Sequence, residues 1–177
     1  MKPRETIELF DLWLAEHSLR LEAVIIGGSA LGLLGITTRQ TRDVDVLVPT
    51  IPEAVAAREF AATRRAVGEV LHEDWLNDGP GQVASLLPPG WEDRIQPAYV
   101  GQSILLQTLG RSDLLLTKLF ALCDRGTDLA DCFALAPSPE ELTEALSWVQ
   151  WQDANPDWPR HVAEVIEDLA RRLGHGA

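Results

Sequence analysis

The chain has 177 residues and a formal net charge of −12 at pH 7, a length that fits one domain or one domain with a small helical appendage. Hydrophobic residues make up 46% and charged residues 24%, as in an ordinary soluble globular protein. The acidity argues against broad attraction to nucleic acid, because phosphate binding needs Lys and Arg on the surface. The ligands and partners that remain compatible with this charge are small anions bound together with a metal, a basic partner protein, or an RNA bound only at one end.

The sequence gives no sign of a membrane or an oxidising compartment. The N-terminal stretch is interrupted by charge, unlike a signal peptide, and no apolar run is long enough to span a bilayer. Cys123 and Cys132 belong to no CxxC pattern and have no neighbouring His ligand. We therefore expect a reduced, cytoplasmic protein without membrane association.

The first 110 residues are predicted to alternate helices with strands, because their apolar residues follow first one spacing and then the other. Pro52 lies in the first turn of the third predicted helix, and Gly68 ends it. In chain order we expect a helix at 6–17, a strand at 22–27, a brief helix at 29–35, a strand at 43–49, a helix at 51–68, and strands at 94–100 and 103–109.

The chain from residue 111 onward is predicted to be helical. Ser112 has the position of an N-cap, Gly126 ends that helix, and Thr127 caps the next one. The sequence "SPEE" at 138–141 is a capping box, and "NP" at 155–156 opens the last helix. The predicted fold is α/β, with an α/β core at 1–110 and a helical C-terminal region at 111–177, together one compact unit.

Two aspartates are the most informative feature of the predicted strand at 43–49. Residues i and i+2 of a strand point the same way, about 6.5 to 7 Å apart, so Asp43 and Asp45 share a face. Such a pair of carboxylates suits Mg²⁺, which prefers oxygen ligands and also takes phosphate oxygens. The alternative is an edge strand with a solvated acidic face.

A glycine turn precedes the aspartates. Gly27, Gly28 and Ser29 follow a buried strand and open the brief helix, with thirteen residues between Ser29 and Asp43. Glycines let a backbone approach a phosphate, and a helix start offers unpaired N–H groups with a favourable dipole. The alternative is a plain turn. A phosphate cradle beside a metal site is a more specific combination than either feature alone.

This combination resembles the signature of the nucleotidyltransferase superfamily that includes DNA polymerase β. The stretch "GGSALGLLGITTRQTRDVDVLV" is closer still to a minimal bacterial branch, the AbiEii-like nucleotidyltransferases often found in toxin–antitoxin modules. "SDLLLTKLFALCDRGTDLADCFAL" is similar to the second signature of that branch, and "DWLND" to the middle of an uncharacterised subgroup. The resemblance covers residues 22–135 and implies a small mixed sheet with helices.

The resemblance implies a reaction and a set of residues. A nucleoside monophosphate would pass from a nucleoside triphosphate to an acceptor hydroxyl, on tRNA or on a protein, with Mg²⁺ or Mn²⁺ as cofactor. Asp43, Asp45, Lys118 and Asp128 would be catalytic; the two strand aspartates would also be metal ligands, and Gly27, Gly28, Ser29 and Arg42 would bind the nucleotide. A cognate toxin or antitoxin partner is implied as well.

The residues themselves leave two interpretations of the lysine helix open. Lys118 and Arg125 lie seven residues apart on one helical face, with Asp128 just beyond. In one interpretation Lys118 offsets the charge of the triphosphate. In the other, the face is a surface strip tied by an Arg125–Asp128 pair or by a pair of Lys118 with an aspartate. Asp131 is interpreted as a first-turn residue favoured by the helix dipole.

A third carboxylate, common in this superfamily, is missing from the predicted strands at 94–100 and 103–109. Asp78 is the substitute metal ligand we predict, with Asp74 behind it, although both fit turn positions. Trp75 is placed to flank a nucleotide. The gap leaves two other hypotheses open: a degenerate member that binds a nucleotide or partner without turnover, and a structural domain with a solvated Asp pair.

Overall fold

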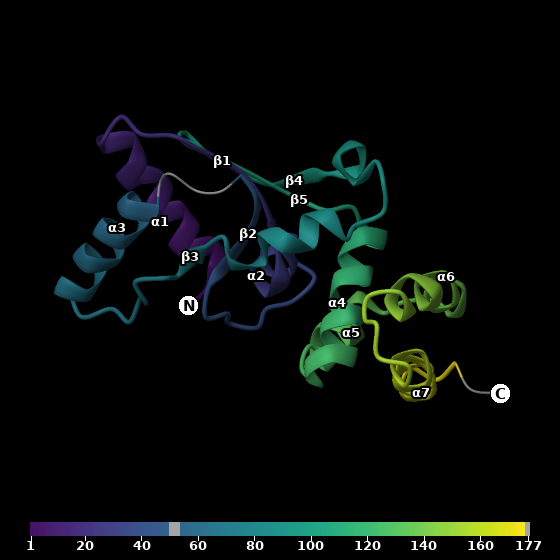
Figure 1. The fold of residues 1–177 in the computed structure, drawn as a ribbon. Coiled ribbons are helices and arrows are strands. Elements are labelled where there is room, and N and C mark those ends of the chain that lie inside the picture. Colours follow the sequence, from purple (N-terminus) through teal and green to yellow (C-terminus); the bar gives the residue numbers. More distant parts are fainter. Residues whose placement is uncertain (50–53, 176–177) are drawn as a thin grey trace. The chain divides into compact units, whose positions relative to one another are not determined.

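The computed structural model describes residues 1–49 and 54–175 (Figure 1). Contacts divide the chain into two compact units, one from Met1 to Gly110 and one from Arg111 onward. The first unit contains a mixed five-stranded sheet with helices, and the second is helical. The predicted α/β class is confirmed.

The elements of the first unit follow the predicted order, with additions in the middle. They are α1 (Pro3–Glu16), β1 (Leu21–Ile26), α2 (Gly27–Leu33), β2 (Val44–Val48), α3 (Ala54–Ala66), β3 (Leu76–Asn77), the 3₁₀ helices η1 (Gly79–Ser85) and η2 (Trp91–Arg94), β4 (Gln96–Val100) and β5 (Ile104–Thr108). The predicted helix start at 51–53, Pro52 included, lies outside the described residues. The two-residue β3 and both 3₁₀ helices are additions.

The strands are arranged in the order β3-β2-β1-β5-β4. β1 pairs antiparallel with β2 and parallel with β5, while β2 pairs parallel with β3 and β5 antiparallel with β4. β1 is therefore the central strand, which explains its nearly continuous apolar sequence "LEAVII". The aspartate-bearing β2 is not an edge strand, because β3 covers its outer side.

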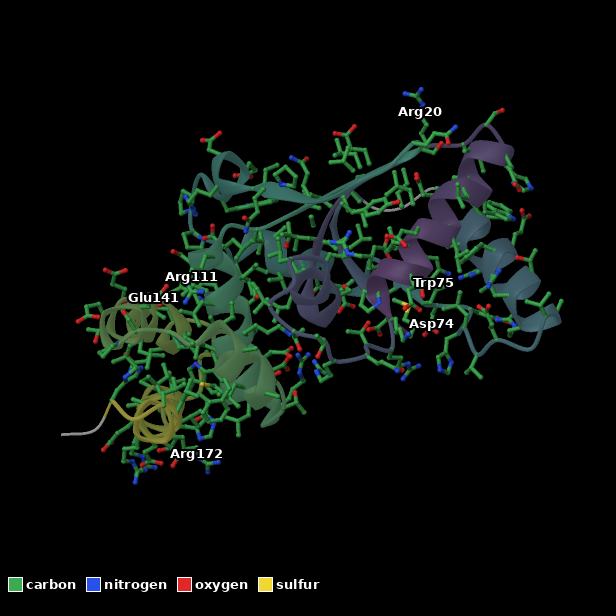
Figure 2. The ribbon with its side chains drawn as sticks, turned by 180° about the vertical axis from the view of Figure 1, so that it is seen from behind. Arg20, Asp74, Trp75, Arg111, Glu141 and Arg172 are labelled. Atoms are coloured by element: carbon green, nitrogen blue, oxygen red, sulfur yellow. The ribbon has the colours of Figure 1, made fainter. Side chains whose placement is uncertain are left out.

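An aromatic cluster joins α1, α3 and the segment before β3. Trp75 meets Phe10 edge to face with ring centroids 5.1 Å apart, and Phe60 lies 5.0 Å from Phe10. The Trp75 indole N–H donates to the Ala57 carbonyl at 3.0 Å, so its polar atom is satisfied inside the core. Trp75 is 0% exposed and its neighbour Asp74 is exposed (both labelled in Figure 2). The idea that Trp75 flanks a nucleotide is therefore wrong.

A buried carboxylate ties α1 to the turn between β4 and β5. Asp11 accepts backbone N–H bonds from Gln102, Ser103 and Ile104 at 2.7–2.8 Å. The Tyr99 hydroxyl lies 3.3 Å from the same carboxylate. Burial and, after it, the nearby Asp11 raise the pKa of Tyr99 to about 12, so this hydroxyl remains a donor at neutral pH.

The second unit consists of helices whose ends follow several of the predicted signals. They are α4 (Arg111–Arg125), α5 (Leu129–Leu135), α6 (Pro139–Gln150) and α7 (Trp158–Arg172). The capping box at Ser138 and Glu141 is confirmed, and Gly126 ends α4 with φ +66°. Ser112 lies inside the first turn of α4, and Asp128 rather than Thr127 is the N-cap of α5.

Arg111 links three parts of this unit. Its guanidinium donates to the Glu141 carboxylate at 2.8 Å and to the Leu135 carbonyl at the end of α5 at 2.7 Å (Figure 2). The hydrogen bond to Arg111 lowers the pKa of Glu141. One residue therefore holds the start of α4, the end of α5 and the start of α6 together.

A search of the described residues for membrane-crossing segments finds no helix with the required length and apolarity.

Candidate functional site

The candidate site begins where β1 turns into α2. Gly27 has φ +79°, a conformation that costs an L-residue about 1–2 kcal/mol. A Cβ on Gly27 would lie 2.7 Å from Oδ2 of Asp45, closer than a side chain tolerates. Glycine therefore avoids a strained backbone here, and it also lets the Asp45 carboxylate keep a position from which a Cβ would displace it.

The antiparallel pairing of β1 and β2 produces this approach. Asp45 pairs with Ile26, the residue before the glycine turn, so the end of β1 and the start of β2 lie side by side. Asp43 stands immediately before β2. Both aspartates are half-buried, in contrast to the fully buried Val44 and Val46 that alternate with them. The predicted glycine turn and at least one of the predicted aspartates are thus adjacent.

Asn77 lies on the other side of Asp45. It pairs with Asp45 across the β2–β3 ladder, and its side-chain N–H donates to Oδ1 of Asp45 at 3.3 Å. Its own side-chain oxygen accepts from the backbone N–H of Gly79 at 3.0 Å. The prediction did not single out Asn77, because a two-residue strand carries no periodic signal.

Ser29 is part of the glycine turn but is less accessible than expected. It is 1% exposed, and its hydroxyl donates to the Ile26 carbonyl at 3.3 Å. Gly28 is half-buried. The hydroxyl therefore closes the turn in this structure, and a phosphate could receive it only after that bond breaks.

Arg42 and Asp78 lie in exposed positions. The Arg42 guanidinium is 3.7 Å from Asp74, and both side chains are 68% exposed, so this ion pair contributes little stability. Asp78 is the exposed N-cap residue of η1. Within 1–49 and 54–175, no three acidic, His or Cys side chains are grouped to hold a metal ion. The structure thus does not gather Asp78 with Asp43 and Asp45.

The second unit holds a separate charged cluster around Lys118. The ammonium donates to Asp128 at 2.7 Å and to Asp131 at 2.6 Å, and Lys118 is 5% exposed. Arg125 approaches the other oxygen of Asp128 at 3.5 Å from the surface. The predicted pairs, Arg125 with Asp128 and Lys118 with an aspartate, are confirmed, whereas the surface strip is wrong, because both Lys118 and Asp131 are buried.

The pKa of Asp128 reflects opposing effects. Burial raises it, but the hydrogen bond and the charge of Lys118 outweigh burial, and the pKa falls below its ordinary value. The two thiols lie in the same unit: burial raises the pKa of Cys123 and of Cys132 to about 12. Both thiols are therefore protonated and unreactive at neutral pH.

The donor set of the first unit fits a divalent cation. Mg²⁺ is usually bound by one or two carboxylates together with substrate phosphates, so Asp43 and Asp45 suffice without a third acidic group. Gly27 supplies the second indication, because the space beside Oδ2 of Asp45 is one that a Cβ would fill. Asp43 and Asp45 are the residues that would hold the ion.

Comparisons with known proteins identify a family for this chain. No curated protein and no solved structure matches the chain. Residues 5–148 match the family described as "Nucleotidyltransferase of unknown function (DUF6036)". Because the match includes the glycine turn, both strand aspartates, Asn77 and the Lys118 cluster, and covers most of the chain, the protein belongs to this nucleotidyltransferase family.

Proposed function

We propose that the protein is a metal-dependent nucleotidyltransferase that moves a nucleoside monophosphate from a nucleoside triphosphate to an acceptor hydroxyl. The observation that supports this most is the approach of Asp45 to Gly27, which brings a carboxylate to a glycine turn at the end of a central strand. Family membership supports the reaction class. The metal, the substrates and the acceptor belong to the proposal.

Asp43 and Asp45 hold the cation together with phosphate oxygens of the nucleotide. When bound, Mg²⁺ or Mn²⁺ supplies charge stabilisation for the attacking and leaving oxygens. Gly27 and Gly28 let the backbone approach the β and γ phosphates, because neither carries a side chain to block them. Ser29 stiffens this turn through its bond to Ile26 and would donate to a phosphate only after that bond breaks.

The transfer itself needs positioning more than covalent chemistry. The acceptor hydroxyl attacks the α-phosphorus and releases its proton to water, the bond from that phosphorus to the oxygen it shares with the β-phosphorus breaks, and pyrophosphate leaves with the electron pair of that bond. The chain contributes by holding the triphosphate in line and by stabilising its charge. Arg42, exposed beside the start of β2, is available to a phosphate at the cost of a weak pair with Asp74.

Lys118 and Asp128 enter the proposal through their resemblance to the second signature of AbiEii-like nucleotidyltransferases. Their contacts already give them a structural role, because Lys118 on α4 pairs with Asp131 in α5 and with Asp128, the N-cap of α5. These bonds use two of the three N–H groups of the ammonium, so a phosphate would have to reach the third at a side chain that is only 5% exposed. Variants at this site therefore need separate measurements of stability and activity.

The acceptor is proposed from charge. With a net charge of −12, the chain favours a hydroxyl on a protein or a small molecule over an extended RNA surface, and RNA held only at a 3′ end is the other acceptor. A cognate toxin or antitoxin partner follows from the AbiEii-like resemblance. Co-expression with the neighbouring gene, scored by growth, tests that partnership.

A second candidate function is nucleotide or partner binding without turnover. The specific observation in its favour is Asn77, an amide beside Asp45 where a third carboxylate would complete an acidic cluster. Two carboxylates are enough to bind a metal–triphosphate complex, but the missing charge would lower the capacity to stabilise the transition state.

Incubation of the purified protein with Mg²⁺ and each α-labelled triphosphate, with cell extract as acceptor, separates these functions. We expect label transfer by the wild type and none by Asp45→Asn, which keeps the size of the side chain but removes its charge. Tight nucleotide binding without transfer would support the second candidate. Neither binding nor transfer with any triphosphate would contradict both.

A further inference from the structure

Asn77 makes two hydrogen bonds that together fix which way its amide points. A carboxylate can only accept, so the group facing Oδ1 of Asp45 at 3.3 Å is the amide nitrogen. A backbone N–H can only donate, so the group facing Gly79 at 3.0 Å is the amide oxygen. A half-turn of the amide would break both bonds, and the orientation is therefore determined by chemistry.

The backbone places this amide opposite Asp45. Asp45 and Asn77 are direct partners in the parallel pairing of β2 with β3, and Asn77 is half-buried between the strand and the turn that opens η1. The other oxygen of Asp45 lies beside Gly27. One oxygen of the carboxylate thus has an amide donor and the other lies beside the glycine turn, and the hydrogen bond from Asn77 is the contact that orients the group.

An amide donor has a different consequence from a cationic one. The bond from Asn77 orients Oδ1 but leaves the negative charge of the carboxylate intact, whereas a Lys or Arg in that place would neutralise it. Metal ligands are commonly oriented by such outer partners, and losing one typically lowers metal affinity by about 10- to 100-fold.

We propose that Asn77 is a positioning residue, which holds the Asp45 carboxylate in the orientation that binds a divalent cation. This inference rests on the proposed function, because it assumes that Asp45 is a metal ligand. It goes beyond the predicted role of Asp78, since it assigns the position beside Asp45 to a neutral side chain that does not itself bind the metal.

The test compares the Mn²⁺ affinity of the wild type with that of Asn77→Ala. Electron paramagnetic resonance on the full chain measures both affinities. We expect the variant to bind Mn²⁺ about 10-fold more weakly while its circular dichroism spectrum is unchanged. Asn155→Ala is the matched control, because Asn155 accepts a backbone N–H two residues on, as Asn77 does, but in the second unit. It should retain the wild-type affinity.

Asn77→Ser provides an independent measurement that does not require Asn77→Ala to fold well. Its hydroxyl oxygen can still accept from the backbone N–H of Gly79, but the shorter side chain no longer reaches Oδ1 of Asp45, and no charge is added. We expect the rise in its thermal midpoint on adding Mn²⁺ to be smaller than that of the wild type. A structural role in the turn alone would leave the Mn²⁺-induced shift at the wild-type value.

The outcomes separate this inference from the proposed function. If the wild type binds Mn²⁺ and a folded Asn77→Ala binds it with the same affinity, or if Asn77→Ser shows the wild-type Mn²⁺ shift, the inference is overturned and the metal site is left standing. A wild type that binds no Mn²⁺, with or without nucleotide, would overturn both. Weakened binding in Asn77→Ala together with a smaller shift in Asn77→Ser supports both.

Discussion

The two units treat acidic side chains in opposite ways. In the first unit an amide and a glycine adjoin the half-buried Asp45. In the second unit Asp128 and Asp131 share the buried ammonium of Lys118. An amide orients a carboxylate without cancelling its charge, whereas an ammonium both orients and neutralises. On the proposed function, the bond from Asn77 leaves the charge of Asp45 for a metal ion, whereas Lys118 balances the charge of Asp128 and Asp131 within the second unit.

The largest loss of stability should follow from removing the buried ammonium of Lys118. Lys118→Met would leave two carboxylates of the second unit without their buried partner, and we expect a loss of about 3–5 kcal/mol in the free energy of unfolding, measured in urea. Arg125→Ala is the control, since Arg125 is 62% exposed and should cost under about 1 kcal/mol. Equal losses in the two variants would break the contrast between a buried and a surface cation.

Asp11 tests whether neutral donors can hold a carboxylate for structure alone. Asp11→Ala would leave three backbone N–H groups of the β4–β5 turn without their acceptor, and we expect a loss of about 3 kcal/mol in thermal or urea unfolding. Tyr99→Phe removes only the longer contact and should cost about 1 kcal/mol or less. A small effect of Asp11→Ala would show that water replaces the carboxylate.

Gly27→Ala should combine a moderate stability loss with a functional one. Both Gly27 and Gly35 have positive φ, so alanine costs about 1–2 kcal/mol at either position. At Gly27 the new Cβ would meet Asp45, whereas a Cβ on Gly35 would have no atom of the described residues, its own chain neighbours aside, within 4 Å. We therefore expect both variants to lose stability but only Gly27→Ala to lose Mn²⁺ affinity. Equal affinity in the two would contradict the role of this close approach.

The acid sensitivity of the second unit should be partly due to Asp128. Its pKa is lowered in the fold, so its contribution to stability is present above the unfolded pKa of about 3.9 and is lost as pH falls through the folded value. In urea unfolding between pH 6 and pH 3, Asp128→Asn should lose less stability than the wild type does. Parallel curves would show that Lys118 does not stabilise the ionised form of Asp128.

The smallest expected effect is at Arg42. Its pair with Asp74 is exposed, so Arg42→Ala should change the free energy of unfolding by less than about 1 kcal/mol. If Arg42 meets a phosphate, nucleotide affinity should fall a few-fold at low salt, and less at high salt, in an equilibrium binding assay. Unchanged nucleotide affinity at low salt would remove Arg42 from the proposed site.

Much of the fold was predictable because its signals are local. Each signal acts within a few residues. The apolar run at 22–27 predicts the strand β1, the capping box at Ser138 predicts the start of α6, and Gly126 predicts the end of α4, and the structure has all three. Ser112 shows the limit of such signals, because a residue with cap chemistry also fits the first turn, and only the hydrogen bonds distinguish the two positions.

The site was predictable only where its residues are close in sequence. The spacing of Gly27 and Asp45 allows one short helix and a return, and the structure places them together. Asn77 reaches Asp45 only through a strand pair that joins segments 32 residues apart, and Asp131 is buried only because α5 packs against α4. Neither tertiary contact leaves a periodic trace in the sequence.

A titration with Mn²⁺, followed by electron paramagnetic resonance, tests the central claim that the acidic pair of the first unit holds a divalent cation. Asp45→Asn and Asp131→Asn make the same chemical change in the two units. We predict that Asp45→Asn lowers Mn²⁺ affinity more than about 100-fold, beyond the range of outer-partner losses, whereas Asp131→Asn retains the wild-type affinity. Equal Mn²⁺ affinity in the wild type and Asp45→Asn would contradict the account.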